Sequence, residues 1–242
     1  MKKLITLAVA ITLSVVSSQA QGLKGLIKKA TDVAKTGSST GLTSDEVGKG
    51  LKEALALGVK KGAEQLSSVD GFLGNAAVKI LLPPEAQQVE KKLRALGFNK
   101  QVDDAIVSMN RAAEDAAKSA APIFVNAITS MSITDAFGIL KGGDTAATVY
   151  LKSKTTTPLK AAFAPVIDSS LAKVGATQLW TALFTQYNKL PFVKKVNPDL
   201  KGYVTDRALA GMFYQVAQEE AKIRKNPAAQ TTALLQKVFG TK

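Results

Sequence analysis

Apolar residues recur at intervals of three and four positions along most of this chain, the spacing that places them on one face of an α-helix. In the segment 205–224 the large apolar residues form one stripe: Leu209, Met212, Phe213, Val216 and Ile223. Comparable stripes occupy residues 43–67, 84–97, 99–117, 122–131, 157–175 and 177–190. Val78–Leu82 is the one strand-like run, and an isolated strand cannot make a sheet. The pattern predicts an all-α fold, a single multi-helix bundle of roughly eight to ten helices.

Capping residues and prolines divide the stripes into separate helices. Thr43 and Glu46 have the spacing of a capping box, so the folded part is expected to begin there. Asn99 is expected to cap the helix that follows it, and Asp144 to cap a helix over 145–153. Thr157-Pro158 predicts the start of a separate amphipathic helix. Asn226-Pro227 predicts the start of the last one.

The first twenty residues have the features of a secretory signal. Lys2-Lys3 precedes an apolar run, Leu4–Val16, and the small residues Ser18 and Ala20 favour cleavage just before Gln21. An uncleaved membrane anchor is disfavoured because the run is short and lacks charged residues on its far side. We therefore expect a signal peptide over 1–20, a mobile basic leader and linker over 21–42, and a helical domain over 43–242. The mature protein is expected in the periplasm or outside the cell, with no transmembrane span.

Composition narrows the chemistry that remains. The chain has no Cys and no His, which excludes disulfides, thiol chemistry, Ser–His and Cys–His catalysis, and the common zinc and copper sites. We predict no metal and no cofactor. The formal net charge of +13 becomes +11 when the two signal lysines are removed. Such a charge could attract nucleic acid, anionic lipid or lipopolysaccharide. The lysines are spread out and do not alternate with aromatic residues, so a soluble basic surface is favoured and no specific nucleic acid is predicted.

A group of charged and polar residues is the first candidate site. Glu220 lies on the apolar stripe of segment 205–224, where a carboxylate is costly unless it is paired, and Arg224 follows one turn later. The candidate polar cluster is Asn110, Arg111, Glu114, Glu219, Glu220 and Arg224. Two carboxylates across a cleft could hydrolyse a glycosidic bond. The favoured alternative is structural: Glu220 is held by Arg224, or by Arg111 from a neighbouring helix, and fixes the helix register.

Aromatic residues concentrate in the second half of the chain and give the second candidate site. The predicted lining of an apolar pocket is Phe163, Trp180, Phe184, Tyr187 and Phe213. Their helical spacing is equally consistent with ordinary core packing, so both interpretations stay open.

Several stretches resemble a bacterial family known as domain of unknown function family 4197. The stretches are Lys79–Gly97, Met109–Ala116, Gly142–Leu151, Phe163–Ala176, Tyr187–Lys195, Tyr203–Phe213 and Glu219–Gly240. The similarity spans roughly residues 51–240. It implies an exported, mostly helical protein, and it carries over no activity, substrate or catalytic residue.

These observations favour an exported, non-enzymatic envelope protein, a helical module that binds a partner or an amphipathic ligand. The first alternative is a carboxylate-dependent hydrolase of envelope glycans, in which Glu114 and Glu220 would face one open cleft. The second is an electrostatic binder of anionic envelope polymers or DNA. The identity of the partner and the oligomeric state do not follow from the sequence.

Overall fold

The structure, a computed structural model, describes residues 43–173, 175–189, 191–192, 194–197 and 199–225. The predicted signal peptide, the leader and the predicted last helix after Asn226-Pro227 lie outside the described residues. Within them there are eight α-helices, one short 3-10 helix and no strand, which confirms the all-α prediction. The elements are α2 (Ser44–Ser67), η1 (Pro84–Ala86), α3 (Gln87–Ala95), α4 (Asn99–Ala117), α5 (Ala120–Thr129), α6 (Ile133–Lys141), α7 (Ala146–Lys173), α8 (Ala176–Tyr187) and α9 (Leu200–Lys225).

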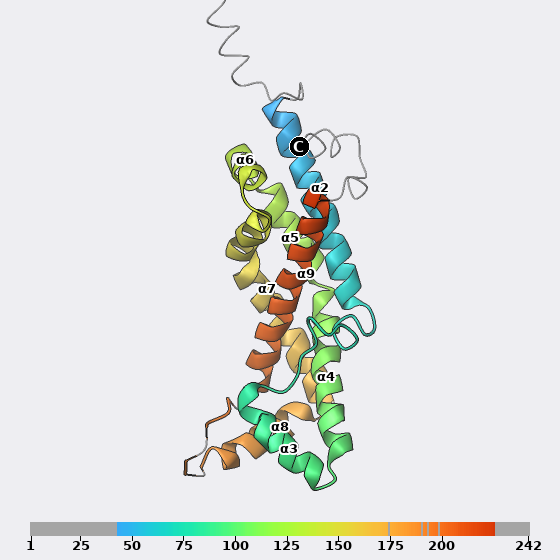
Figure 1. Cartoon of the computed structure of the whole chain (residues 1–242), viewed down its shortest axis with the longest axis vertical. Coiled ribbons are helices and arrows are strands. Elements are labelled where there is room, and N and C mark those ends of the chain that lie inside the picture. The colour runs from blue at the N-terminus through green and yellow to red at the C-terminus, as the bar shows by residue number, and fades with distance from the viewer. Residues whose placement is uncertain (1–42, 174, 190, 193, 198, 226–242) are drawn as a thin grey trace, which may run out of the picture. The chain divides into compact units, whose positions relative to one another are not determined.

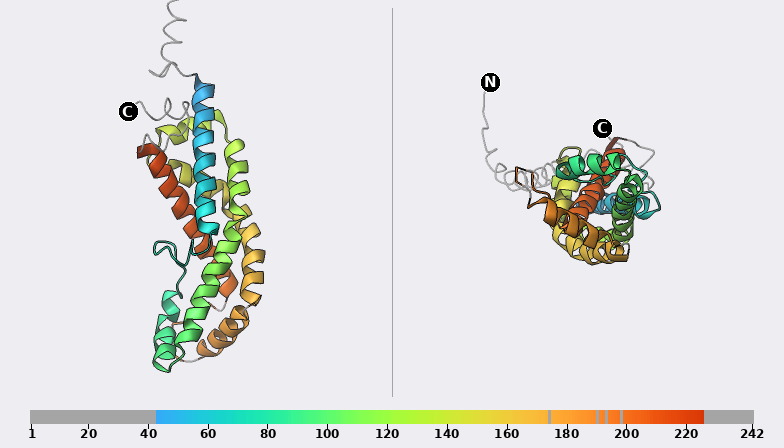
Figure 2. Two further views of the ribbon diagram at one scale, coloured as in Figure 1. Left: turned by 90° about the vertical axis from the view of Figure 1, so that its right-hand side faces the viewer. Right: turned by 90° about the horizontal axis from the view of Figure 1, so that it is seen from below.

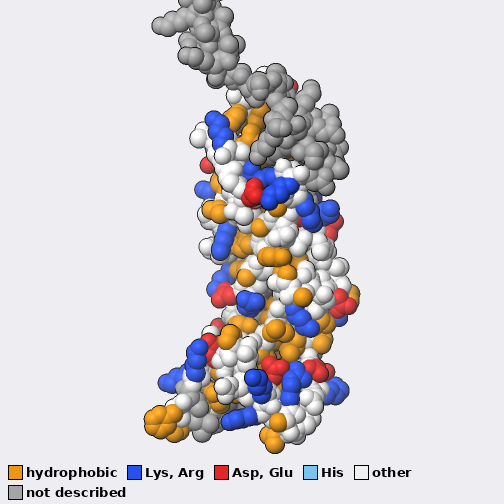
Figure 3. All heavy atoms as spheres, in the orientation of Figure 1, with side chains coloured by type: hydrophobic (Ala, Val, Ile, Leu, Met, Phe, Trp, Pro, Cys, Tyr) orange, Lys and Arg blue, Asp and Glu red, His pale blue; other side chains and the backbone are white. Residues whose placement is uncertain are grey.

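The long helices α7 and α9 pack against each other along the helical unit; α2 packs on α9 in the half nearer α6, and α4 packs on α7 in the half nearer α3 and α8 (Figures 1 and 2). The segment that carries the Leu209 stripe is α9, which packs against α7, α2 and α4. The short helices α3 and α8 lie together at one end of the unit, and α6 lies at the other (Figure 1). Lys and Arg side chains are spread along the visible face of the unit (Figure 3).

The helix α7 corrects the prediction that a separate helix starts at Thr157-Pro158. It runs without interruption through Pro158 and Pro165. Its fully buried residues recur every four positions across the first proline: Leu151, Thr155, Leu159, Phe163, Ile167 and Leu171. A proline inside a helix costs about 3 kcal/mol, whereas each large apolar side chain that is buried contributes about 1.5–3 kcal/mol. Burial of one continuous stripe therefore outweighs the local preference for a break.

Several helix ends also differ from the predicted ones. The residue that precedes α4 as its N-cap is Phe98, and Asn99 is the first helical residue. The predicted helix over 145–153 is the first part of α7, which begins at Ala146. At α6, by contrast, Ser132 and Asp135 form a capping box through reciprocal side-chain to backbone hydrogen bonds.

Glycine allows three close approaches in the core. A Cβ on Gly58 of α2 would lie 3.2 Å from Ile223 Cδ1 of α9. A Cβ on Gly62 of α2 would lie 3.2 Å from Gln215 Cγ of α9. A Cβ on Gly211 of α9 would lie 2.6 Å from a ring carbon of Phe72, which is fully buried. The backbones of α2 and α9 and the Phe72 ring therefore depend on these missing side chains.

Among the described helices, none is by itself both long and apolar enough to cross a membrane. The helices α5 and α6 pass the length and composition test only as a pair, and they are bent by 106° relative to each other.

Two glycine substitutions should change stability in opposite directions. Gly211→Ala should lower the free energy of unfolding by about 1–3 kcal/mol, because the new methyl group overlaps the Phe72 ring. Gly138→Ala, at an exposed position inside α6 with open space around its Cα, should raise it by about 0.5–1 kcal/mol, since alanine has the higher helix propensity. Urea denaturation followed by circular dichroism measures both. Equal stability of the two variants would contradict the packing described for Phe72.

Candidate functional site

The charged residues of α4 hold the irregular segment that joins α2 to η1. Glu114 Oε1 accepts hydrogen bonds from the backbone N–H groups of Phe72 and Leu73, both at 3.1 Å. Its Oε2 pairs with Arg111 Nη1 at 2.6 Å, and Arg111 Nη2 reaches Asp70 Oδ1 at 2.8 Å. The hydrogen bonds to Glu114 and then to Asp70 raise the pKa of Arg111 above its usual value. Glu114 thus fixes the turn that directs the Phe72 ring into the core.

Asn110, one turn before Glu114, holds the next part of the same segment. Its Oδ1 accepts from the Ile80 N–H at 2.8 Å, and its Nδ2 donates to the Ile80 carbonyl at 2.8 Å and to the Ile106 carbonyl at 2.7 Å. The hydroxyl of Tyr203 on α9 donates to the Leu81 carbonyl at 2.7 Å. Burial raises the pKa of Tyr203, which keeps this hydroxyl a donor at alkaline pH. A segment without regular structure is therefore satisfied by side chains from α4 and α9.

Glu220 of α9 caps the N-terminus of α7. Its Oε1 accepts from the Ala147 N–H at 2.9 Å, and its Oε2 accepts from the N–H and hydroxyl of Thr148 at 2.8 and 2.7 Å. Arg224 binds Oε1 through Nε at 3.0 Å and Nη2 at 2.9 Å, and it also donates to the Ile139 carbonyl. The first N–H groups of a helix lack partners within the helix and carry its positive dipole end, so a buried carboxylate is stabilised there. The Glu220–Arg224 pair indicated by the sequence is present, and its backbone partners on α7 are additional.

Glu219 faces a different neighbour. Its carboxylate accepts from Lys222 at 2.6 Å and from Gln215 at 3.4 Å, and Gln215 in turn reaches Gln65 of α2 at 2.9 Å. Adjacent residues of a helix point about 100° apart, so Glu219 lies against α2 while Glu220 lies against α7.

The six predicted polar residues therefore form three separate clusters. Glu114, Arg111 and Asn110 hold the segment before η1, Glu220 and Arg224 hold the start of α7, and Glu219 joins α9 to α2. Both oxygens of Glu114 and both oxygens of Glu220 are engaged by backbone N–H groups, an arginine or a hydroxyl. The structure does not bring Glu114 and Glu220 into the shared open cleft that hydrolysis by these two carboxylates requires. Among the described residues, no group of three or more acidic side chains is placed to hold a metal ion.

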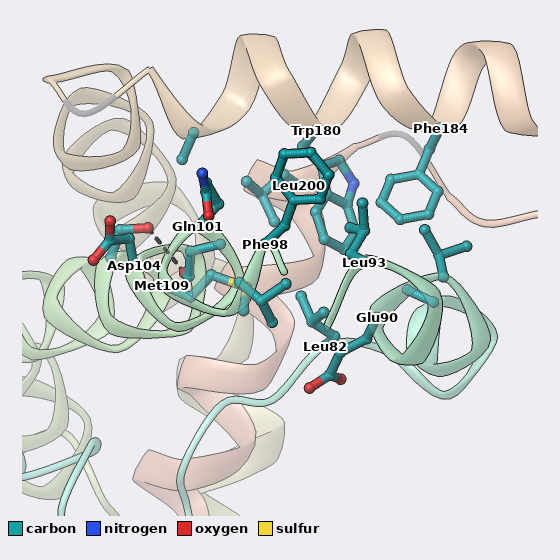
Figure 4. Close-up of a pocket in the computed structure, with 16 residues that line it drawn as sticks. Leu82, Glu90, Leu93, Phe98, Gln101, Asp104, Met109, Trp180, Phe184 and Leu200 are labelled. Atoms are coloured by element: carbon teal, nitrogen blue, oxygen red, sulfur yellow. Dashed lines mark hydrogen bonds between the residues drawn. The ribbon is translucent and has the colours of Figure 1, made fainter. Parts of the chain in front are cut away.

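An apolar pocket of about 330 Å³ lies where α3, α4 and α8 meet (Figure 4). Of the 16 residues that line it, 12 are apolar: Leu82, Ala86, Val89, Leu93, Phe98, Val102, Ala105, Met109, Ala176, Trp180, Phe184 and Leu200. Figure 4 shows Trp180 and Phe184 on one side, with Phe98 and Leu93 facing them. The indole N–H of Trp180 donates to the Asn197 carbonyl at 3.2 Å, so the polar atom of this side chain is satisfied by protein.

Two of the five predicted aromatic residues, Trp180 and Phe184, line this pocket. Tyr187 is half-buried and packs edge-on against Phe184 outside it. Phe163 is fully buried in the core, and Phe213 packs edge-on against Phe124 with ring centroids 5.8 Å apart. The remaining lining residues, most of them from α3 and α4, were not predicted. The signal available in the sequence was the short apolar stripe of Val89, Leu93 and Leu96; the structure shows that α3 has no buried residue.

The polar residues of the pocket are Glu90, Gln101, Asp104 and Ser108. Glu90 pairs with Arg94 at 3.0 Å, and Asp104 pairs with Lys100 at 2.6 Å. The rim carboxylates therefore have basic partners within the protein. These carboxylates therefore do not need a cationic ligand, and an anionic ligand would be repelled by them. A ligand whose polar group is uncharged or zwitterionic avoids both problems.

Replacing Glu220 by leucine should destabilise the protein by about 3–5 kcal/mol, because Arg224 is left buried without its partner. The double variant Glu220→Leu/Arg224→Met should recover only part of this loss, since the N–H groups of Ala147 and Thr148 still lack an acceptor. Thermal unfolding measures both. The control, Asp206→Asn, breaks an exposed pair with Lys160 and should leave the melting temperature nearly unchanged. If Glu220→Leu lowered the melting temperature no more than the control does, the stabilising role of the Glu220 contacts would be contradicted.

Comparison with known proteins gives a family and no activity. No curated protein and no solved structure matches this chain. Residues 41–240 match the family described as "Protein of unknown function (DUF4197)", which covers all the described helices. The chain therefore belongs to the DUF4197 family.

Proposed function

We propose that this protein is an exported helical module that binds an amphipathic ligand in the pocket between α3, α4 and α8. The observation that carries the proposal is the pocket itself, an apolar chamber of about 330 Å³ whose lining includes four polar residues, Glu90, Gln101, Asp104 and Ser108. Ligand pockets are typically of this kind: concave, mostly apolar, about 300–1,000 Å³ in volume, with a small number of polar groups that orient the ligand.

The form of the pocket favours a ligand with one apolar chain or small ring system. Trp180, Phe184 and Phe98 provide flat apolar surfaces, and Leu93 and Met109 provide flexible ones. Gln101 and Ser108 can exchange hydrogen bonds with a polar head group. Each methylene group that such a ligand buries contributes about 0.8 kcal/mol, so a chain that fills the pocket gains affinity stepwise.

The export half of the proposal is supported by sequence. Residues 1–20 have the basic start, apolar run and small-residue cleavage site of a signal peptide, and they lie outside the described residues. A pocket for an amphipathic molecule suits the cell envelope, where such molecules are abundant. The hydrolase alternative draws no support from Glu114 and Glu220, whose oxygens are occupied in separate clusters.

Trp180 is the chain's single tryptophan and lines the pocket, so its fluorescence reports occupancy directly. Lysophosphatidylcholines, which have a zwitterionic head group, should quench Trp180 when their acyl chain is brominated at its end, with affinity rising about fourfold for each added methylene until the pocket is filled. Fluorescence titration across a series of chain lengths measures this. Absence of quenching at every chain length, together with an empty protein by native mass spectrometry after purification from its own host, would overturn the proposal.

A matched pair of variants locates the binding. Ala105→Phe adds a ring inside the pocket and should abolish quenching. Ala127→Phe adds the same ring on α5, at a half-buried position in the groove between α5 and α7, and should leave quenching unchanged. Circular dichroism confirms that both variants are folded. Equal loss in both variants would mean that the ligand is not held between α3, α4 and α8.

A further inference from the structure

The loop between α8 and α9 presents an aromatic side chain to solvent. Phe192 is fully exposed, at 106 %, and its φ of +62° is a backbone conformation that bulky residues rarely adopt. Lys189, Lys194 and Lys195 flank it and are also exposed. Hydrophobic side chains accordingly gather at the tip of this loop, at the lower left of Figure 3, with Lys or Arg side chains beside them. An unfavourable backbone conformation that exposes a large apolar ring needs an explanation other than packing.

The base of the loop is closed by hydrogen bonds. Asn188 donates to the Val196 carbonyl at 2.7 Å and accepts from the Val196 N–H at 2.8 Å, which closes the loop. Trp180 binds the next residue, Asn197, through its indole N–H. Lys194 reaches Glu85 of η1 at 3.2 Å. These contacts join the loop to both α8 and η1.

The same end of the unit exposes a second apolar site at the turn between α3 and α4. Leu96 is 72 % exposed and Phe98 is 45 % exposed, on either side of Gly97. Lys91 and Lys92 lie exposed on the last turns of α3. Figure 1 places α3, α8 and the loop after α8 together at this end.

The charges at this end are positive once ion pairs within the protein are taken into account. Glu85, Glu90, Asp103 and Asp104 are each paired with a lysine or an arginine. The exposed Asp199 of the loop makes no ion pair with the described residues but accepts the Gly202 N–H at the start of α9. Four exposed lysines make no ion pair within the described part of the chain: Lys91, Lys92, Lys189 and Lys195. The available charge therefore attracts an anionic surface.

We propose that this end of the helical unit docks on an anionic lipid surface. Phe192 and Leu96 enter the boundary between head groups and acyl chains, and the lysines around them contact lipid phosphates. Apolar tips flanked by lysine are suited to a membrane interface. Protein interfaces are by contrast depleted in lysine, which favours a lipid surface over a protein partner here. The inference does not rest on the pocket holding a ligand, although Phe98 also lines the pocket and so places its lining next to the proposed contact.

Vesicle co-sedimentation tests the proposal with the purified protein. Vesicles that contain phosphatidylglycerol should bind it, neutral phosphatidylcholine vesicles should bind it much less, and added NaCl should weaken the binding. Phe192→Asp should reduce binding about tenfold or more. The control is Val149→Asp, which changes another exposed apolar residue, on the first turn of α7. It should bind as the wild type does, and equal binding by both variants would overturn the proposal.

Charge is tested with a second matched pair. Lys189→Glu/Lys195→Glu and Lys60→Glu/Lys152→Glu change the net charge equally, but only the first pair lies at the proposed contact; all four lysines are exposed. The first double variant should lose vesicle binding, and the second should retain most of it. All variants share the basic leader, residues 21–42, so any contribution of that segment to binding is the same in each. Equal loss in both double variants would show attraction by net charge alone and would overturn the proposal.

A site-specific reporter separates lipid contact from other binding. In Phe192→Trp the new indole is fully exposed, whereas Trp180 is 7 % exposed. Vesicles made with brominated phospholipid should quench the new fluorescence and shift it to shorter wavelength, and the wild type should respond much less. Binding to vesicles without any change at position 192 would show that another surface is used. Failure of the wild type to bind anionic vesicles would likewise refute the proposal and leave a protein partner as the explanation for the exposed ring.

Discussion

Hydrogen bonds from backbone N–H groups to two buried carboxylates hold this helical unit together. Glu220 receives the first free N–H groups of α7, and Glu114 receives those of the turn that carries Phe72. In both cases a side chain of one helix supplies acceptors that the neighbouring chain segment cannot supply for itself. An arginine one turn away balances each negative charge. The position of α9 relative to α7, and of α4 relative to the turn that carries Phe72, depends on these contacts, since separating either pair would leave buried polar groups without partners.

Much of the fold follows from periodicity, and some of the polar network does too. The stripe of Leu209, Met212 and Val216 was sufficient to predict α9 as a buried helix, and the four-residue spacing of Glu220 and Arg224 was sufficient to indicate their pair. The N–H groups that Glu220 and Glu114 bind could not be predicted, because a backbone donor is present at almost every residue and has no signature of its own. Contacts between residues 42 or 73 positions apart, such as Phe72–Glu114 and Ala147–Glu220, become visible only when the helices are placed in space.

Packing decided one helix boundary against a local rule, and it decided between the two interpretations left open for one aromatic residue. Thr157-Pro158 has a local preference to begin a helix, but the stripe through Leu151, Thr155 and Leu159 is continuous and is buried as one face. The aromatic residue Phe163 suggested a pocket, yet a large side chain on the central stripe fills the core. The pocket arises instead at the end of the bundle, where α3 is too short to complete the packing over Trp180 and Phe184.

Prolines inside α7 have a mechanical consequence. Pro158 and Pro165 each remove a backbone donor, so the hydrogen-bonded ladder of α7 has two gaps along its length. This helix begins at the carboxylate of Glu220 and leads into α8, which carries Trp180. A helix that lacks backbone hydrogen bonds bends at a lower energetic cost than a helix that has all of them. We therefore expect any bending of α7 to concentrate at these two prolines, and because α7 leads into α8, such bending would move Trp180 relative to α3 and α4.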